Sequence, residues 1–528
     1  MAINNGKQFI NGQRVATHTP ALESINATDY QPTGYLFSQA SIEEVDAAAQ
    51  AAEAAFVLYS QTSQEQRAGF LDEIAVEIEA LGASLQEVAS LETGLPLARL
   101  QGETGRITGQ LRLFAQLLRR GDFYAARIDP ALPDRKTMPR VHLRQYKVGL
   151  GPVAVFGASN FPLAFSTAGG DTVAALAAGC SVVFKAHSGH MATAELVAEA
   201  IEKAVVKCGM PAGTFNMIFG GRIGADLVAH PLIQAVGFTG SLEGGMALYN
   251  IAQNRPQPIP VFAEMSSVNP LVVMPQALAV RGAQIAQDTV ASFNMGCGQF
   301  CTKPGLILGV KSPEFDRFIE GLVAHTEQAT PQVMLNPGTL KSYQQGVAAL
   351  NAEAGFEQIA QGQAATLVSQ ASAYLFQADQ SLLLSGNAQL QHEVFGPMSI
   401  VITVDDEATL LQGIHQLAGQ LTATIIGEEA ELATAQALLA LFMRKAGRVL
   451  FNGFPTGVEV CDAMVHGGPF PATSDARGTS VGTGAIERFM RPVCYQNTPQ
   501  ALLPDALKNE NPLQINRLIN GELTKAAL

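Results

Sequence analysis

The chain has 528 residues, of which 47% are hydrophobic and 15% charged, and its formal net charge is −13. This length exceeds what one hydrophobic core usually supports, so we expect two or more domains. The acidic balance, with no block of lysine and arginine, argues against nucleic-acid binding, which needs a positively charged surface.

Membrane and secreted classes are also disfavoured. Residues 148–184 are poor in charge, with Asp171 as the single charged residue, but glycines and prolines interrupt them too often for a membrane span. The first residues lack the basic-then-apolar order of a signal peptide. The six cysteines are scattered and form no disulfide framework. We therefore expect a protein of the reducing cytoplasm without a membrane partner.

The first part of the chain is predicted to be mostly helical after an initial hairpin. Asn11-Gly12 lies between apolar-flanked segments and predicts a type I′ turn. Residues 41–44 (SIEE) and 63–66 (SQEQ) both match the capping-box pattern at a helix start. The first of these helices is expected to reach about Tyr59.

From residue 151 the pattern changes to alternating strands and helices. Predicted strands lie at residues 151–157, 181–185, 214–220 and 234–238. Asn160, followed by Pro162, predicts the start of the helix that ends at Gly179. Such alternation indicates a parallel sheet covered on both faces, whose ligands bind at the carboxyl ends of its strands.

Residues 295–305, MGCGQFCTKPG, carry Cys297 and Cys301 in a stretch rich in glycine. Redox pairs typically use the spacing Cys-x-x-Cys, and a structural zinc site needs four ligands, for which no second pair is suitably spaced. Composition alone therefore favours two buried thiols that behave as small hydrophobic residues.

The motif around Cys301 belongs to a set that resembles those of the aldehyde dehydrogenase superfamily, and their order and separations agree over essentially the whole chain. The motifs are ASNFP at 158–162, GFTGS at 237–241, AEMSS at 263–267, GQFC at 298–301, EVFGP at 393–397, FNGFPTG at 451–457 and MVHGGPF at 464–470.

The resemblance implies an α/β fold with a Rossmann-type parallel-sheet cofactor domain, an α/β catalytic domain and a small oligomerisation arm. The implied boundaries are residues 1–138 and 150–263 for the cofactor domain, 264–480 for the catalytic domain, 139–149 and 485–500 for the arm, and 501–528 for a C-terminal tail. The chain from Arg491 onward is rich in proline and asparagine, and from this composition we expect it to wrap a neighbouring surface. Members of the family assemble as homodimers or homotetramers through such an arm.

The resemblance also implies the catalytic residues. Cys301 is the nucleophile, because a thiolate can form an adduct that expels hydride and leaves a hydrolysable thioester; Cys297 is structural. Asn160, with the backbone N–H of Cys301, would stabilise the oxyanion, its alternative role being a helix N-cap. Glu264 matches the general base, although Met-Ser-Ser follows it instead of Leu-Gly-Gly. Taken alone, it would be read as a surface residue of an edge strand.

The implied cofactor is NADP or NAD, without a metal. Gly240 and Ser241 match the turn that binds the cofactor phosphates at a helix N-terminus. Lys185 matches the lysine that reaches the adenosine ribose. Glu393 matches the residue that holds the nicotinamide ribose, and Phe395 of the same motif is a further contact.

Ser188 indicates a preference for NADP. Relatives that prefer NAD place a glutamate there, which would repel a 2′-phosphate, whereas serine accepts one. Lys185, with Arg222 from the next loop, would supply positive charge. The alternative is that Ser188 only caps the following helix.

The substrate follows from the branch that the motifs resemble, which includes NADP-linked 2,5-dioxovalerate (α-ketoglutaric semialdehyde) dehydrogenases and fatty aldehyde dehydrogenases. Arg106 is expected to bind a remote carboxylate, unless it only pairs with Glu103. His466 would contact polar substrate groups, act as an acid or base, or be a satisfied core residue. Apolar walls are expected from Phe161, Met295 and Phe454.

Two other classes remain as alternatives. Relatives that transfer the acyl group to coenzyme A or phosphate do not need Glu264, so its presence favours hydrolysis. A catalytically silent structural or binding member would not need Cys301, Asn160 and Glu264 together. The sequence therefore predicts a hydrolytic, NAD(P)-dependent aldehyde dehydrogenase, with 2,5-dioxovalerate to 2-oxoglutarate as the preferred reaction.

Overall fold

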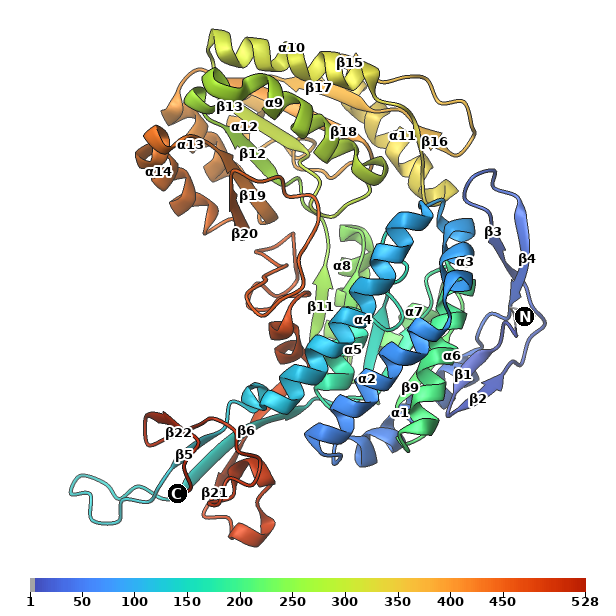
Figure 1. Cartoon of the computed structure of the whole chain (residues 1–528), viewed down its shortest axis with the longest axis vertical. Coiled ribbons are helices and arrows are strands. Elements are labelled where there is room, and N and C mark those ends of the chain that lie inside the picture. Colours follow the sequence, from blue (N-terminus) through green and yellow to red (C-terminus); the bar gives the residue numbers. More distant parts are fainter. Residues whose placement is uncertain (1–4) are drawn as a thin grey trace.

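The structure, a computed structural model, describes residues 5–528. Two lobes lie one above the other in Figure 1, each built on its own sheet, and an arm extends from the base of the lower lobe. Among the described residues, no helix is both long and apolar enough to cross a membrane.

The lower lobe is built on a seven-stranded sheet in the order β11-β10-β7-β8-β9-β1-β2. Four parallel strands match the predicted ones: β7 (Val153–Phe156), β8 (Val182–Lys185), β9 (Phe215–Ile218) and β10 (Ala235–Thr239). A fifth parallel strand, β11 (Val261–Glu264), forms one edge of the sheet. The hairpin of β1 (Gln8–Ile10) and β2 (Gln13–Val15) completes it. Asn11 and Gly12 between them have φ of 53° and 72°, as a type I′ turn requires.

Helices cover both faces of this sheet, as predicted. They are α1 (Ile42–Tyr59), α2 (Gln64–Ala80), α3 (Ala83–Thr93), α4 (Leu97–Arg120), α5 (Asp171–Ala177), α6 (Met191–Lys207), α7 (Ile223–Ala229) and α8 (Leu242–Gln253). Successive strand residues point to opposite faces: Val155 packs in the core with α2, α4 and α6, and Ala154 in the core with α1, α7 and α8. Both predicted capping boxes are formed.

One predicted helix start is wrong. The chain after β7 forms turns through Gly170, and α5 begins only at Asp171. Here the backbone folds back on itself so closely that a Cβ at Gly169 would lie 2.1 Å from the Ala164 carbonyl oxygen. Gly170 then has φ of 53°, which a right-handed helix does not allow. Asn160 is therefore a loop residue and not a helix cap.

The upper lobe repeats this arrangement with a sheet in the order β15-β17-β18-β13-β12-β19-β20. Its strands are β12 (Pro270–Val273), β13 (Leu306–Val310), β15 (Phe356–Gln361), β17 (Tyr374–Ala378), β18 (Met398–Val404), β19 (Gln420–Ile426) and β20 (Ala446–Phe451), and only β15 pairs antiparallel. Its helices are α9 (Pro275–Asn294), α10 (Pro313–Gln328), α11 (Pro337–Ala352), α12 (Gln380–Ser385), α13 (Glu407–Gln416) and α14 (Leu432–Phe442).

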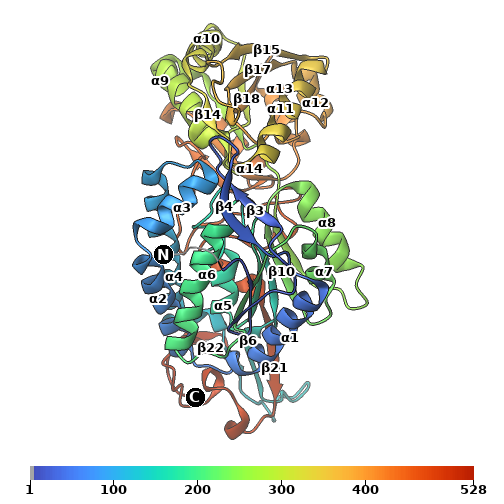
Figure 2. The same ribbon diagram turned by 90° about the vertical axis from the view of Figure 1, so that its right-hand side faces the viewer.

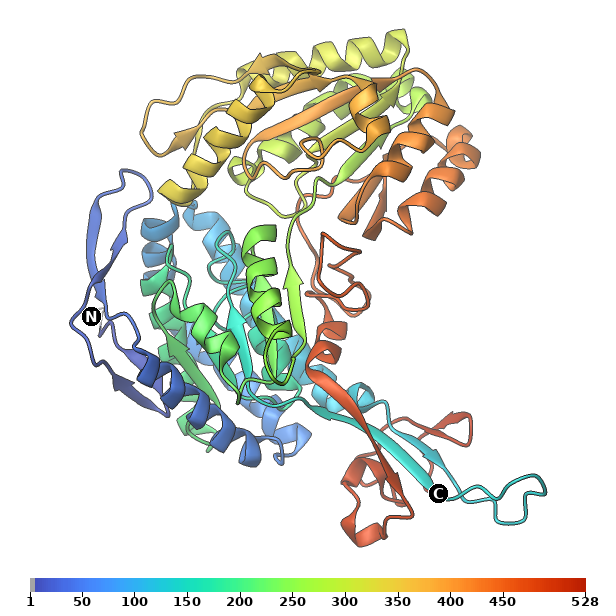
Figure 3. The same cartoon turned by 180° about the vertical axis from the view of Figure 1, so that it is seen from behind.

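Several segments connect the lobes. In Figure 3, β11 runs along the side of the lower lobe toward the upper one, and the chain continues into β12. The hairpin of β3 (Leu22–Ile25) and β4 (Pro32–Phe37) lies on the right-hand side in Figure 1 and crosses the middle of the face seen in Figure 2. Ser369, between α11 and β17, donates from its hydroxyl to the carbonyl of Thr28 in the loop of that hairpin.

The arm is a five-stranded sheet in the order β21-β6-β5-β22-β23. The two predicted arm segments form its longest pair, β6 (Leu143–Gly149) with β21 (Met490–Gln496). The sheet is larger than predicted, because β5 (Arg127–Asp129), β22 (Arg517–Ile519) and β23 (Glu522–Thr524) also belong to it. The C-terminal residues thus pair with the arm of their own chain.

Candidate active site

One cavity brings several of the predicted residues together. The carboxyl ends of β7, β10 and β11, the loop that follows β7, the loop before β13 and the segment after β20 all contribute to its wall. The residues that line it include Asn160, Phe161, Phe165, Ser166, Asp171, Thr239, Glu264, Phe300, Cys301, Thr302, Val458, His466 and Ser480.

A tight turn presents Cys301 to this cavity. Gly296, Cys297 and Gly298 have φ of 56°, 59° and 62°, three consecutive left-handed residues. A Cβ at Gly298 would lie 2.2 Å from the carbonyl oxygen of Gly396, so this position of the GQFC motif admits only glycine. The Cys297 side chain is buried in the core of the upper lobe, with its sulfur 3.3 Å from the sulfur of Met334.

The nucleophile loop is also fixed by a residue that the sequence analysis did not single out. Asn269, just before β12, donates from its side-chain amide to the carbonyls of Cys301, at 2.8 Å, and Lys303, at 2.9 Å. Its side-chain oxygen accepts from the hydroxyls of Ser267 and Thr422, each at 2.9 Å. Asn269 therefore connects the chain that leaves Glu264 with the loop that carries Cys301.

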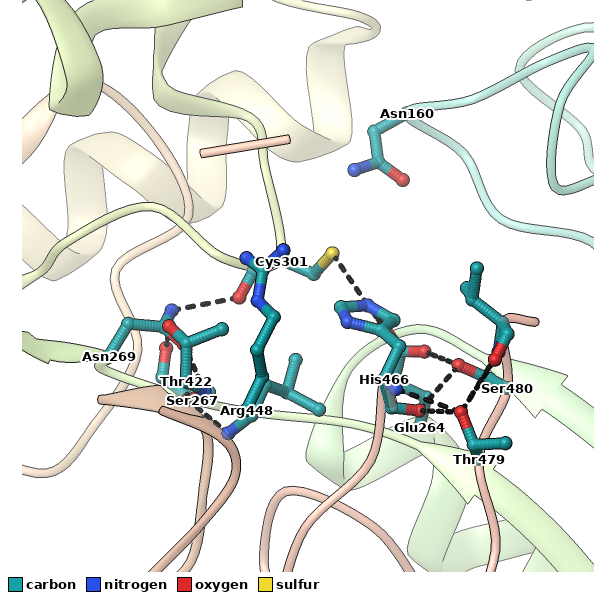
Figure 4. Close-up of polar contacts among 12 residues, drawn as sticks. Asn160, Glu264, Ser267, Asn269, Cys301, Thr422, Arg448, His466, Thr479 and Ser480 are labelled. Carbon is teal, nitrogen blue, oxygen red and sulfur yellow. Dashed lines mark hydrogen bonds and ion pairs between the residues drawn. The ribbon is translucent and has the colours of Figure 1, made fainter. Parts of the chain in front are cut away.

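His466 lies between Cys301 and Glu264. Its Nε2 atom is 3.3 Å from the sulfur of Cys301 and 2.8 Å from Oε1 of Glu264 (Figure 4). Ser480, which the sequence analysis did not identify, donates from its hydroxyl to the other oxygen of Glu264. His466 and Glu264 are 3% and 5% exposed, so these contacts replace contacts with water.

His466 is not a satisfied core histidine. Both of its side-chain contacts use the same nitrogen, and its buried Nδ1 atom has no hydrogen-bond partner among the residues that the structure describes. The backbone N–H of His466 donates to Thr479 Oγ1 at 2.8 Å, which holds the residue in place. Sequence reasoning identified its motif but could not show the contact with Cys301.

The electrostatic environment keeps the thiol protonated and the carboxylate charged. Burial raises the pKa of Cys301 well above its ordinary value, and the negative charges of Glu264 and Glu393 raise it further. Burial also acts to raise the pKa of Glu264, but His466 and the hydrogen bonds from Ser480 and Cys301 together bring that pKa below its ordinary value. The site thus pairs a neutral thiol with a base.

The same three side chains also form a possible set of metal ligands. One ligand atom each of Glu264, Cys301 and His466 lies within 4.8 Å of the others. Zinc accepts thiolate, imidazole and carboxylate ligands. Nucleophilic and acid–base chemistry accounts for the same proximity without a metal.

Asn160 lies across the cavity from Cys301 in Figure 4. Its side-chain amide donates to the carbonyl of Gln299 at 3.0 Å, and its own backbone carbonyl accepts from Arg99 at 2.7 Å. Arg99, which belongs to none of the motifs, also lies over the rings of Phe161 and Phe300, at 5.1 and 4.8 Å from their centroids.

Three expectations for the substrate region are wrong. Glu103 pairs with Arg99, at 3.2 Å, so the alternative pairing with Arg106 is not formed. Met295 is 49% exposed and does not line the cavity. Phe454 packs against the core of the upper lobe. The residues that replace the last two as apolar walls are Phe165, Phe300 and Val458, beside the expected Phe161.

Arg106 lies in a neighbouring groove on the outer side of α4. This groove is lined by Gly102, Gly105, Arg106, Gly109, Gln110, Arg112, Leu113, Gln116, Glu459 and Val460. Val458 of the cavity wall directly precedes Glu459, so the two hollows adjoin along one segment. Arg106 is thus at the approach to the cavity and not in its wall.

The predicted cofactor residues of the lower lobe gather where β8, β9 and β10 end. Lys185 is the last residue of β8, and burial lowers its pKa to about 8. Ser188 is exposed and does not cap α6, whose N-cap is His190 without a side-chain bond. Arg222 is exposed at the start of α7. The alternative role of Ser188 as a cap is therefore wrong.

The turn after β10 fits a phosphate group. Ser241 caps α8, and its hydroxyl accepts the N–H of Gly244 at 3.1 Å. A Cβ at Gly240 would lie 2.6 Å from the ring of Phe238, so the turn is open only because glycine stands there. Free N–H groups at a helix N-terminus bind anions, which makes this end of the sheet suitable for a nucleotide.

Glu393 and Phe395 lie in the upper lobe, in the loop before β18, and both are partly exposed. Burial raises the pKa of Glu393 to about 7, while Lys303 and the polar groups of Ser266 and of the Ser267 backbone act to lower it. Its charge also affects Cys301, so this loop lies close to the nucleophile.

Comparisons with known proteins find similarity over nearly the whole chain. A family model described as "Aldehyde dehydrogenase family" matches residues 15–469. The chain is 77% identical to alpha-ketoglutaric semialdehyde dehydrogenase of Acinetobacter baylyi over 525 residues, which cover 99% of this chain and 100% of that protein. It is 52% identical over 521 residues to alpha-ketoglutaric semialdehyde dehydrogenase 2 of Azospirillum brasilense, covering 98% and 99% of the two chains.

A solved structure extends the likeness to the fold. A double mutant of betaine aldehyde dehydrogenase from Staphylococcus aureus, in complex with NAD+, has a TM-score of 0.79 to this chain at 21% identity, covering 94% of this chain and 97% of that one. At this identity the likeness concerns the fold alone, and it confirms the predicted α/β fold class.

Proposed function

This chain belongs to the aldehyde dehydrogenase family, and from that premise we propose that it oxidises 2,5-dioxovalerate (α-ketoglutaric semialdehyde) to 2-oxoglutarate with NADP as the preferred cofactor. Membership makes the protein an enzyme that acts on an aldehyde with NAD or NADP. The substrate proposal is supported by the two full-length relatives named for this semialdehyde. The observation that carries the chemistry is the contact of His466 with both Cys301 and Glu264.

In the proposed mechanism, Cys301 loses its proton within this cluster. Nε2 of His466 gives its proton across 2.8 Å to Glu264 and takes the proton of the thiol in its place. Because one nitrogen makes both contacts, the proton does not need to cross the imidazole ring. The thiolate then adds to the aldehyde carbon, and the new oxyanion is stabilised by the side-chain amide of Asn160 and the backbone N–H of Cys301.

The second half of the reaction releases the acid. When bound, NAD or NADP supplies the acceptor for the hydride that the adduct expels, which leaves a thioester on Cys301. Glu264 first releases the former thiol proton to solvent and then takes a proton from water, whose oxygen bonds to the acyl carbon as the sulfur departs as a thiolate and is protonated again. The products are the carboxylic acid and free Cys301. Hydrolysis by Glu264 distinguishes this proposal from acyl transfer to coenzyme A or phosphate.

The residues that would hold the cofactor come from both lobes. Gly240 and Ser241 would bind its phosphates, and Lys185 its adenosine ribose. The nicotinamide half would be held by Glu393 and Phe395. The turn after β10 supports this assignment, because it presents a capped helix N-terminus without a side chain in the way.

A second candidate, oxidation of fatty or medium-chain aldehydes, is favoured by the apolar walls of the cavity. Phe161, Phe165 and Phe300 pack together there, with Phe161 edge-on to the other two rings. The initial rates of cofactor reduction with 2,5-dioxovalerate and with decanal separate the two candidates. We expect kcat/KM to be higher for the dioxo acid; a higher value for decanal would overturn the substrate proposal.

Replacing Arg106 with glutamine tests the proposed recognition of the carboxylate. We expect kcat/KM for 2,5-dioxovalerate to fall by about 10- to 100-fold, because a hydrogen bond between charged groups is lost, while decanal is little affected. Arg112→Gln is a matched control, since Arg112 lines the same groove but is paired with Glu79 at 2.6 Å. Equal effects of Arg106→Gln on both substrates would contradict a role in carboxylate binding.

The proposed preference for NADP depends on Ser188. Because this side chain is exposed, a glutamate fits there, and its charge would repel the 2′-phosphate. We expect Ser188→Glu to lower the ratio of kcat/KM with NADP to kcat/KM with NAD by about 100-fold, whereas Ser188→Ala changes it little. A ratio that both variants leave unchanged would place the determinant elsewhere.

The assembly is proposed to be a homodimer or homotetramer formed through the arm. The arm sheet extends from the body of the chain in Figures 1 and 3, and it ends in the strands β21 and β23 at its two edges. Edge strands of this kind offer unpaired backbone groups to another chain.

A further inference from the structure

Three side chains of the active-site cavity present donor atoms that suit one metal ion. The sulfur of Cys301, a ring nitrogen of His466 and a carboxylate oxygen of Glu264 lie within 4.8 Å of one another. Nε2 of His466 is 3.3 Å from the sulfur and 2.8 Å from Oε1 of Glu264. Among residues 5–528 no other set of three histidine, cysteine, aspartate or glutamate side chains comes this close. Metal-binding donor atoms thus converge at one place in the described chain.

The distances between these donor atoms are close to those of a tetrahedral zinc site. Zinc binds sulfur at about 2.3 Å and nitrogen or oxygen at about 2.0–2.2 Å. In a tetrahedron these lengths place the sulfur about 3.6 Å from the nitrogen, and the nitrogen about 3.4 Å from the oxygen. The atoms of this site therefore need to separate by only about 0.3 and 0.6 Å, a change within reach of small side-chain rotations.

Contacts that a metal would leave intact already hold the ligands. The backbone N–H of His466 donates to Thr479 Oγ1 at 2.8 Å. The Ser480 hydroxyl donates to Oε2 of Glu264, which leaves Oε1 toward His466. All three ligands also line the cavity, so a fourth coordination position on that side is available to water. The ligand set is therefore preformed.

The donor types select the metal. Thiolate and imidazole suit zinc, whereas magnesium and calcium prefer oxygen ligands. A thiolate and a carboxylate together carry two negative charges, which balance the charge of Zn²⁺, and the imidazole binds as a neutral ligand. This balance matters because His466 and Glu264 are 3% and 5% exposed, and an unbalanced charge is costly to bury.

We propose that Zn²⁺ binds to Cys301, His466 and Glu264 and inhibits this enzyme reversibly. On binding, the S–H bond of Cys301 breaks, a Zn–S bond forms and the proton leaves to solvent, with no change of oxidation state. His466 binds through Nε2 and carries its proton on Nδ1. A coordinated sulfur does not add to an aldehyde, and a coordinated Glu264 does not accept a proton from water. Zinc therefore blocks both halves of the proposed reaction.

The environment of Nδ1 favours reversible binding over a permanently bound metal. In resident metal sites the second ring nitrogen of a histidine ligand usually donates to a carboxylate, a carbonyl or water. Nδ1 of His466 is buried and has no hydrogen-bond partner among the residues that the structure describes. The zinc form therefore buries an unpaired N–H group, which lowers its affinity. A chelator should thus restore the active enzyme.

Calorimetric titration of the full-length protein with Zn²⁺ tests the site without any substrate. We expect one equivalent to bind to the wild type, binding to be about 10-fold or more weaker in His466→Gln and Glu264→Gln, and none to occur at this site in Cys301→Ala. Co²⁺ in the same titration should give the charge-transfer absorption of a cobalt–thiolate bond. Initial rates with 2,5-dioxovalerate and NADP+ should fall with rising Zn²⁺ and recover with EDTA.

Cys461→Ala is the matched control, because Cys461 is a partly exposed thiol outside the ligand set. We expect it to bind Zn²⁺ and to be inhibited like the wild type. If His466→Gln and Glu264→Gln bind Zn²⁺ as tightly as the wild type, a lone thiol holds the metal and the inference is overturned. Protection of Cys461→Ala from inhibition, or inhibition that EDTA does not reverse, would overturn it as well. An enzyme that binds Zn²⁺ as expected but does not oxidise 2,5-dioxovalerate would refute the substrate proposal alone.

Discussion

Replacing Cys301 with alanine is expected to lower kcat for aldehyde oxidation by about 10⁴-fold or more, because the adduct and the thioester both need its sulfur. Cofactor affinity should change little, since none of the proposed cofactor contacts is removed. Initial rates with 2,5-dioxovalerate, together with calorimetric titration of NADP+, measure the two quantities.

Cys297→Ala is the matched control for this experiment. It removes a thiol from the same loop, but one that is buried against Met334 in the upper core. We expect it to retain most of the activity and to lower the thermal unfolding temperature instead. Activity that survives Cys301→Ala but is lost in Cys297→Ala would reverse the assignment of the two cysteines.

The second large effect is expected for Glu264→Gln. If Glu264 activates the water that hydrolyses the thioester, its loss should lower steady-state turnover by about 10²- to 10⁴-fold. The first turnover would still occur, because His466 remains in contact with the thiol at 3.3 Å. Stopped-flow measurement of reduced cofactor should then show a burst of about one equivalent per active site followed by a slow phase.

His466→Gln separates the roles of the two residues. Loss of the imidazole removes the group that receives the thiol proton, so we expect the burst itself to become slower. A burst of wild-type rate in His466→Gln would mean that Glu264 takes the proton directly. Steady-state turnover that is unchanged in Glu264→Gln would exclude Glu264 as the hydrolytic base.

Local signals in the sequence predicted local structure well. The capping boxes at residues 41–44 and 63–66 and the turn at Asn11-Gly12 depend on contacts within a few residues, and all three are formed. The helix expected at Asn160 failed because its local signals are overridden by the close packing of Gly169 against its own loop. Propensity alone cannot show such an approach.

The site was only partly predictable, because its contacts join distant segments. Motifs identified Cys301, Glu264 and His466 as site residues. The sequence could not show that Nε2 of His466 contacts both of the other side chains, because these contacts depend on how three distant segments pack together. Asn269 and Ser480 carry no motif of their own. The ion pair of Arg99 with Glu103 could have been predicted, because the i, i+4 spacing on a helix can be read from the sequence.

The close approach of Gly298 to Gly396 has a consequence for exchanging parts between relatives. A Cβ at Gly298 would lie only 2.2 Å from the Gly396 carbonyl oxygen. The backbones of the two loops therefore pack in direct contact, and their shapes are complementary. Lys303 adds its bonds to Val394 and Met398 across the same junction. A chimaera that takes residues 295–305 from one parent therefore has to take residues 391–398 from the same parent. Otherwise, two loops that pack in direct contact would come from different sequences.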